Sequence, residues 1–196
     1  MFIKTYFVVL LLFITPILSQ TYCAGDQISL DDQNIEYPVG AGYGDYDTGD
    51  IFKLSDLNGD VNGGEYHVIF IDLSTSWCDP CYYTAPYIDE LEEEFESSGV
   101  KFITALADPG QPYSFEDWQA VGDPEMPLII NDDVTSPSIF DLFHDASNSN
   151  PAFVIIDHTM QVRGKPRPLG ANSNTNVCDG SEEYHSIPLF FTLTRR

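Results

Sequence analysis

Two cysteines separated by two residues, Cys78 and Cys81, are the side chains of this sequence best suited to chemistry. They lie in the segment Trp77-Cys78-Asp79-Pro80-Cys81, between an apolar run and a long stretch rich in carboxylates. Thiols at positions i and i+3 of a helix start lie on one edge of the first turn, close enough to form a disulfide. Such a pair can exchange its disulfide with the thiols of another molecule.

At a helix start the two sulfurs lie in different environments, so we expect them to have different roles. Cys78 lies near unpaired backbone N–H groups and the positive helix end, which favour the thiolate, so we expect it to be the nucleophile. Cys81 would then attack the mixed disulfide and release the substrate. Pro80 suits the first helical turn. The charge of Asp79 opposes thiolate formation and favours a reducing couple, with a potential of about −270 mV. An inert structural disulfide is the alternative.

The elements that position this motif follow from the hydrophobic pattern. Residues 67–73 are typical of a buried strand, and the segment after Cys78 has the three- and four-residue apolar spacing of an amphipathic helix. The other predicted strands and helices cover residues 51–54, 100–107, 114–121, 127–130, 136–146, 152–156 and 160–162. This order predicts an α/β fold with a mixed central β-sheet flanked by helices.

The two ends of the chain lie outside this alternation. Residues 1–19 combine a positive charge, an apolar run and a final small residue, as a secretory signal peptide does. A membrane anchor is the alternative, but the run is shorter than the ~20 residues that a span requires. We therefore expect an extracytoplasmic protein, periplasmic or secreted, without a membrane span after signal removal. Residues 20–50 predict an irregular extension, 51–170 the folded domain and 171–196 a tail.

The remaining cysteines, Cys23 and Cys178, flank the predicted domain. Outside the cytosol they can form a structural disulfide with each other, bond to another molecule or stay free, and the sequence leaves all three open. A closed zinc site lacks ligands, because no second Cys-x-x-Cys and no His-x-x-x-His follows. The calcium-like run at 56–62 lacks the glycine and the glutamate of an EF-hand. We expect no metal, and no cofactor besides the redox-active disulfide of Cys78 and Cys81.

Composition limits the partners. The 196 residues carry 8 Lys+Arg against 31 Asp+Glu, a net charge of -23, and are 43% hydrophobic. This content supports a packed core in about one domain. So acidic a surface repels phosphate backbones and anionic headgroups, which excludes nucleic acid and membrane surfaces as main partners.

Several positions around the cysteines carry a family resemblance. Asp72 lies six positions before Cys78, Pro86 lies five after Cys81, and Pro151 precedes a later apolar strand. With the Trp-Cys-x-Pro-Cys motif, they resemble the thioredoxin superfamily. More narrowly, the chain is similar to exported thiol-disulfide oxidoreductases of the TlpA and ResA type, relatives of the AhpC/TSA redoxins. The resemblance covers residues 51–164 and implies a thioredoxin-like fold.

The resemblance also implies roles for residues near the cysteines. Asp72 would be the buried carboxylate that accepts and returns the proton of Cys81; the alternative is a strand-end carboxylate satisfied by backbone or solvent. Pro151 would be cis beside the cysteines, and Asn150 would present backbone groups to an extended substrate. The substrate-docking surface would include Trp77, Asp79 and Pro80.

Three functions are compatible with these residues. The first, which we favour, is an exported oxidoreductase that reduces or exchanges disulfides in proteins and receives electrons from an upstream donor. The second is a peroxidase-like redoxin, which would need a Pro-x-x-x-Thr-x-x-Cys motif. Thr75 stands three residues before Cys78, but Ile71 occupies the proline position. The third is a binding module whose disulfide is static.

Overall fold

A computed structural model describes residues 21–122, 127–144, 150–166, 175–176 and 181–182 of the chain. The strands are β1 (Tyr37–Ala41), β2 (Ile51–Phe52), β3 (Val68–Thr75), β4 (Val100–Ala107), β5 (Leu128–Asn131), β6 (Ala152–Ile156), β7 (Val162–Gly164), β8 (Thr175–Asn176) and β9 (Ser181–Glu182). The α-helices are α1 (Leu30–Gln33), α2 (Asp79–Phe95), α3 (Phe115–Gln119) and α4 (Ile139–Phe143), and the 3₁₀ helices are η1 (Leu54–Leu57) and η2 (Glu96–Ser98).

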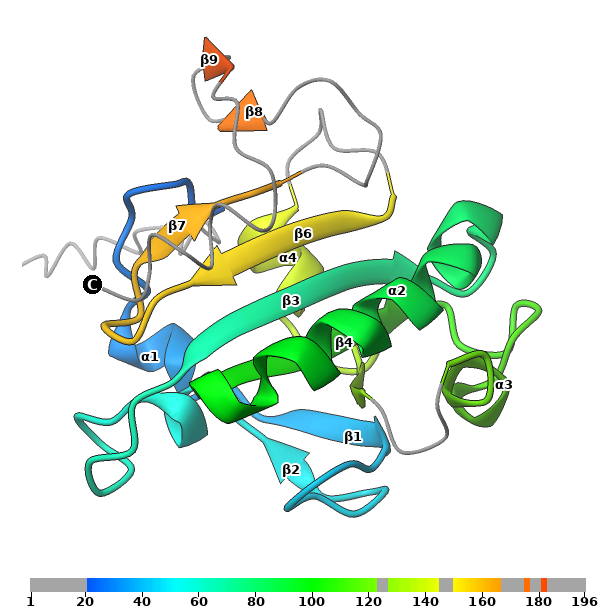
Figure 1. Cartoon of the computed structure of the whole chain (residues 1–196), viewed down its shortest axis with the longest axis horizontal. Helices are drawn as coiled ribbons and strands as arrows, with labels where there is room; N and C mark the ends of the chain where they lie inside the picture. The colour runs from blue at the N-terminus through cyan, green and yellow to red at the C-terminus, as the bar shows by residue number, and fades with distance from the viewer. Residues whose placement is uncertain (1–20, 123–126, 145–149, 167–174, 177–180, 183–196) are drawn as a thin grey trace, which may run out of the picture.

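Seven strands form one mixed sheet in the order β2-β1-β5-β4-β3-β6-β7. The strands β3, β4 and β5 are parallel, whereas β6 runs antiparallel to β3 and β1 runs antiparallel to β5. Figure 1 shows α2 in front of this sheet and α4 behind it. The predicted α/β class, with a mixed central sheet flanked by helices, is confirmed.

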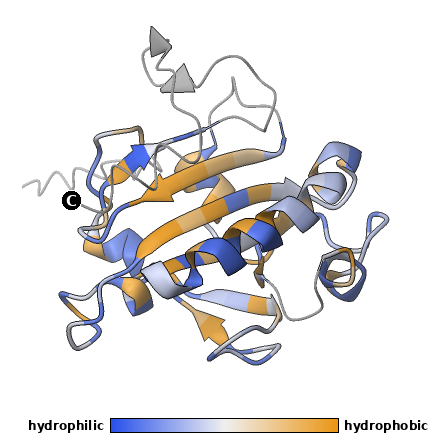
Figure 2. Cartoon of the chain, in the orientation of Figure 1, coloured by the Kyte–Doolittle hydropathy of each residue, from blue (hydrophilic) through white to orange (hydrophobic). Residues whose placement is uncertain are grey.

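The central strand β3 separates two apolar cores, because successive side chains of a strand point to opposite faces. Ile69, Ile71 and Leu73 belong to the larger core, which α4 covers. Phe70 belongs to the second core and packs there with Ile88 of α2. Figure 2 shows the corresponding pattern, with largely hydrophobic strands β3 and β6 and a largely hydrophilic outer face of α2.

The helix α2 begins and ends where the sequence predicts. Cys78 is its N-cap, and the Cys78 sulfur accepts a hydrogen bond from the backbone N–H of Cys81. Pro80 fits the first turn because a proline there removes no helical hydrogen bond. After η2 the chain turns at Gly99, whose φ of 74° lies in the left-handed region that glycine adopts readily.

Residues 21–50, the described part of the expected irregular extension, contain regular structure. Their strand β1 is buried inside the sheet between β2 and β5, and Tyr22 and Ile28 also pack in the larger core. The sequence of β1, Tyr-Pro-Val-Gly-Ala, hides this strand because proline and glycine are poor strand formers. Packing explains the glycine at position 40, since a Cβ there would lie 2.5 Å from the Phe115 ring of α3.

Other expectations are met in part or fall outside the described residues. Strands β4 and β6 have the predicted bounds, whereas α4 is shorter than the predicted 136–146 because it starts after Pro137 with Ser138 as N-cap. The proposed signal peptide at 1–19 lies outside the described residues, as does most of the 171–196 tail. In the part of the chain that is described, no helix has the length and apolar character needed to cross a bilayer.

Candidate redox site

Cys78 and Cys81 are joined by a disulfide, with their Cα atoms 5.2 Å apart. The bond closes across the first turn of α2, at the end of the sheet where β3 stops. Cys78 is 5% exposed and Cys81 is fully buried. The order of exposure agrees with the expected roles, because an incoming thiol or disulfide reaches Cys78 first.

Aromatic side chains surround the disulfide on its buried side. The two cysteines pack with Trp118 of α3 in one cluster, and Tyr82 and Tyr113 pack against it. The rings of Tyr82 and Tyr113 are stacked with centroids 4.0 Å apart. This packing leaves the outer side of Cys78 as the approach to the sulfurs.

Asp72 lies under α2, in the middle of β3. It is 2% exposed, and burial raises its pKa to about 7, against a smaller opposing effect of the Ser74 hydroxyl. That hydroxyl lies 2.9 Å from each carboxylate oxygen and donates its hydrogen bond to them. A carboxyl group with a pKa near neutral can both accept and return a proton under physiological conditions.

The sheet register connects Asp72 to the buried cysteine. Asp72 and Ser74 share a face of β3 with Phe70, which packs against α2. Ser74 lies beside Leu106 in the β3–β4 pairing, and Leu106 packs in the cluster that contains Cys81. Asp72 therefore lies on the side of the sheet that Cys81 covers, where the expected role as a proton acceptor would place it.

Pro151 enters the site from the start of β6. The Asn150–Pro151 peptide bond is cis, as predicted, and Pro151 is buried. The pairing of Leu73 with Ala152 brings this bond to the end of β3, just before the redox motif. There the Asn150 side-chain amide donates a hydrogen bond of 3.3 Å to the Thr75 hydroxyl.

Trp77 forms the exposed rim of the site. Its side chain is 58% exposed, and its indole N–H donates a 2.8 Å hydrogen bond to the carboxylate of Asp108. Ser76 fixes the loop that carries Asp108, because its hydroxyl bonds to the backbone of Gln111 and Tyr113. The indole is thus held outside the core at a defined position, available to a partner.

The remaining predicted residues are placed as follows. Asp79 and Pro80 are exposed on the first turn of α2, beside the disulfide. Cys23 lies before α1, on a segment that the structure does not bring to the redox site, and its backbone N–H donates to Asp26. Cys178 lies outside the described residues, so the pairing of Cys23 with Cys178 stays a prediction.

Sequence reasoning missed Ser74, Thr75 as the partner of Asn150, and the aromatic enclosure. The sequence could have revealed Ser74. It stands two positions after Asp72 in an apolar strand, so the two side chains must lie on the same face of that strand. The aromatic enclosure had no comparable signal. Tyr113 and Trp118 come from a separate loop and helix, and only the folded chain brings them to Cys81.

Comparison with known proteins agrees with this geometry. The sequence profile described as "AhpC/TSA family" matches residues 29–165, which is more than half of the chain. The chain belongs to the AhpC/TSA family. In this AhpC/TSA protein the match includes the redox motif, Asp72, Pro151 and strand β1. No curated protein sequence matches the chain.

Solved structures similar to this AhpC/TSA protein are thioredoxin-like. A Chlorobium tepidum protein described as a thiol:disulfide interchange protein, DsbE, is 18% identical to this chain, with a TM-score of 0.52. The match covers 74% of this chain and 85% of the Chlorobium chain. A secreted Mycobacterium tuberculosis disulfide oxidoreductase is 14% identical, with a TM-score of 0.50, covering 68% and 84%. The exposed lipoprotein thioredoxin of Streptococcus pneumoniae is 15% identical, with a TM-score of 0.51, covering 82% and 96%. These likenesses show the fold.

Proposed function

We propose that this protein is an exported thiol-disulfide oxidoreductase that reduces or exchanges disulfides in other polypeptides. The observation that carries the proposal is the Cys78–Cys81 disulfide at the start of α2, with Cys78 the outer and Cys81 the inner sulfur. A purely structural disulfide of this size would add little stability, because it closes a very short loop. The buried Asp72, with its raised pKa, has a chemical role only if Cys81 gains and loses a proton.

The reaction proceeds from the reduced protein in two exchange steps. The Cys78 thiolate attacks one sulfur of the substrate disulfide, which forms a mixed disulfide and releases one substrate thiolate. Asp72 then accepts the proton of Cys81, and the Cys81 thiolate attacks the Cys78 sulfur, which releases the second substrate thiolate. Two electrons pass to the substrate, and the protein ends with the Cys78–Cys81 disulfide. An upstream dithiol donor must supply two electrons for the next cycle.

Substrate placement in this proposal uses the rim of the site. An extended substrate segment lies beside the cis Asn150–Pro151 bond and contacts the exposed Trp77, Asp79 and Pro80. Backbone groups of Asn150 pair with that segment much as a neighbouring strand would. The apolar run within residues 1–19 supports export, where disulfides persist in substrates.

Insulin reduction with dithiothreitol as electron source tests the activity. We expect turnover by the wild type and none by Cys78→Ser, because this variant lacks the attacking sulfur. Cys81→Ser should instead accumulate the mixed disulfide, detectable by mass spectrometry, because the resolving sulfur is missing. Titration of the wild-type pair against glutathione then gives its potential and the direction of electron flow.

The same protein preparations separate the other candidates. The AhpC/TSA membership makes a peroxidase the second candidate, although Ile71 stands where the peroxidase motif has proline. Consumption of hydrogen peroxide that exceeds insulin reduction would establish that second function. A protein that turns over neither insulin nor peroxide would be a binding module, and the exchange mechanism would be wrong.

A further inference from the structure

The outer face of α2 carries a line of aromatic and acidic side chains that starts at the disulfide. Its members lie three or four positions apart, so they form one strip along the helix, here called the exposed stripe: Asp79, Tyr83, Tyr87, Glu90 and Glu94. The stripe lies opposite the buried face of α2, which contains Cys81 and Ile88. Its side chains therefore face away from the sheet.

The two tyrosines distinguish this stripe from an ordinary solvated acidic helix face. Tyr83 is 71% exposed and Tyr87 is 54% exposed. Among the described residues, the aromatic side chains with such exposure are Tyr66, Trp77, Tyr83 and Tyr87, so all but Tyr66 lie within ten residues of Cys78. Exposed tyrosine and tryptophan gathered at one place are characteristic of surfaces that bind another protein.

Among the described residues, no ion pair involves the carboxylates of the stripe. Lys101 is the sole lysine or arginine of the sequence between Lys53 and Arg163. The ion pairs seen among the described residues, Lys53–Glu36 and Arg163–Asp157, involve other elements. The carboxylates of the stripe therefore present a negative field that starts beside the redox site, and such a field attracts cationic partners.

We propose that the exposed stripe docks a lysine- or arginine-rich segment of the polypeptide whose disulfide exchanges with Cys78 and Cys81. This substrate class rests on the exchange activity proposed above. The carboxylates pair with the cations of that segment, and the exposed faces of Tyr83 and Tyr87 make cation–π contacts with them. Such a pairing explains why tyrosines and carboxylates share one line on the helix.

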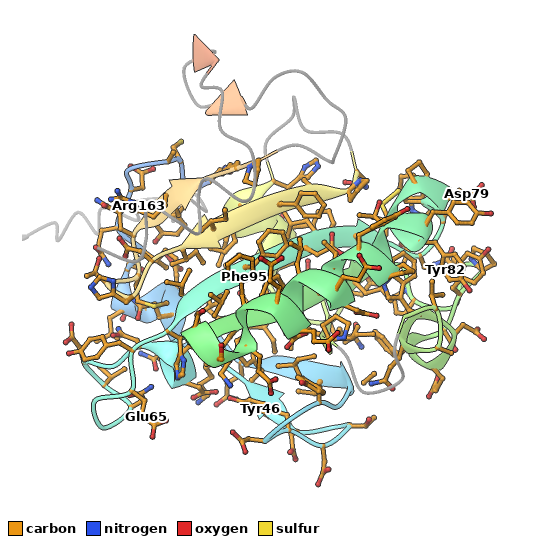
Figure 3. All side chains as sticks on the ribbon, in the orientation of Figure 1. Tyr46, Glu65, Asp79, Tyr82, Phe95 and Arg163 are labelled. Atoms are coloured by element: carbon orange, nitrogen blue, oxygen red, sulfur yellow. A yellow bond between two sulfur atoms is a disulfide. The ribbon has the colours of Figure 1, made fainter. Side chains whose placement is uncertain are left out.

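The length and position of the stripe define the segment. At 1.5 Å of rise per helical residue, the stripe is roughly 22 Å long, which matches about seven residues of extended chain. Figure 3 shows the Asp79 side chain projecting outward where α2 begins, so the stripe reaches the disulfide at that end. The basic segment should therefore start within a few residues of the substrate cysteine.

Binding of peptides that cannot exchange tests the docking separately from the chemistry. Three fluorescent peptides have both cysteines replaced by serine and share one sequence except for a flanking segment that is rich in Lys, Gln or Glu. We expect the basic peptide to bind the oxidised protein at least about tenfold more tightly than the acidic one at low ionic strength. This preference should largely disappear in about 1 M salt, where the Debye length falls to roughly 3 Å.

Matched variants locate the preference on the stripe. Glu90→Gln/Glu94→Gln removes two charges from the stripe, and Tyr83→Ala/Tyr87→Ala removes its rings; each should weaken basic-peptide binding several-fold. The control Asp31→Asn/Asp45→Asn removes two exposed charges from elsewhere and should bind as the wild type does. Equal binding of the three peptides, or an equal loss in the control, would overturn the proposal.

Disulfide-bridged versions of the same peptides complete the test. Faster reduction of the bridged basic peptide, lost in the stripe variants, supports both docking and exchange. If no bridged peptide is reduced but the binding preference holds, the exchange activity is wrong and the docking surface stands. If the three bridged peptides are reduced at one rate and bind equally, the exchange activity stands and the docking surface is wrong.

Discussion

The two faces of β3 differ next to the redox motif, although Ile69 and Phe70 make both of them apolar farther away. On the face covered by α4, the buried side chains Ile69, Ile71 and Leu73 are apolar. On the face covered by α2, Asp72 and Ser74 are equally buried and hydrogen-bonded to each other. Burial of a carboxyl group is unfavourable unless it is protonated or well bonded. The unfavourable burial of the Asp72 carboxyl group beside the redox motif indicates a chemical role for the α2 face of β3. The α4 face has a structural role.

The two faces of β3 can be compared closely because Ile71 and Asp72 are adjacent residues. Ile71 and Asp72 share one strand, the same partner strands β4 and β6, and almost complete burial, and they differ in the face to which they point. Substitutions at these two positions should therefore separate stability from catalysis.

The largest effect is expected on the α4 face, from Ile71→Ala. This change leaves a cavity in the large core and should lower the free energy of unfolding by about 4 kcal/mol, with Ile71→Val costing about 1 kcal/mol. Urea denaturation followed by circular dichroism measures both. The pH profile of disulfide exchange should stay as in the wild type, and a shifted profile in Ile71→Val would contradict the separation of the two faces.

Asp72→Asn should produce the second effect, on the rate of disulfide exchange. Without a proton acceptor for Cys81, resolution of the mixed disulfide should slow on the order of 10²-fold near pH 7. In the wild type this step should accelerate as pH rises through about 7, the pKa to which burial raises Asp72, because only the ionised carboxylate accepts a proton. Stopped-flow single turnovers from pH 5 to 9 show this inflection. Its persistence in Asp72→Asn would rule out Asp72 as the acceptor.

The strands and the redox site also show how much of the fold the sequence could predict. The apolar pattern was sufficient for β3, β4, β6 and the redox helix, and the Cys-x-x-Cys spacing was sufficient for the disulfide. The pattern failed at β1, where Gly40 serves the close approach of Phe115, a reason that only tertiary packing reveals. It also failed for the aromatic enclosure of Cys81, because Tyr113 and Trp118 reach the site through long-range folding. Local order was readable in the sequence, whereas the approach of Pro151 to the redox motif was predicted only through the family resemblance.

A third effect concerns stability and pH. The pKa of Asp72 is raised by burial from its ordinary value near 4 to about 7, so the folded state binds its proton more tightly than the unfolded state does. The contribution of this proton to stability is full below pH 4 and is lost as pH rises to about 7. Asp72→Asn should therefore gain stability over the wild type by roughly 4 kcal/mol between pH 4 and pH 8.

Urea unfolding of the oxidised proteins at pH 4, 6 and 8 measures this difference. Burial also raises the pKa of Glu92 to about 8 and that of Asp132 to about 6, and both groups act in the same direction. They are present in both proteins, so the difference between the two curves reports Asp72. A difference that stays constant with pH would mean that Asp72 titrates alike in the folded and unfolded states.

The smallest effect should come from Ser74, which lies two residues from Asp72 on the same face. Its hydroxyl stabilises the carboxylate, so Ser74→Ala should raise the pKa of Asp72 further, on the order of one unit for the loss of one hydrogen bond to a charged group. The inflection of the resolving step should move upward by that amount while the rate plateau at high pH stays nearly the same. Ser74→Thr keeps the hydroxyl and should restore the wild-type inflection. An unchanged inflection in Ser74→Ala would show that burial alone sets the proton affinity of Asp72, and the α2 face would then act through a single side chain.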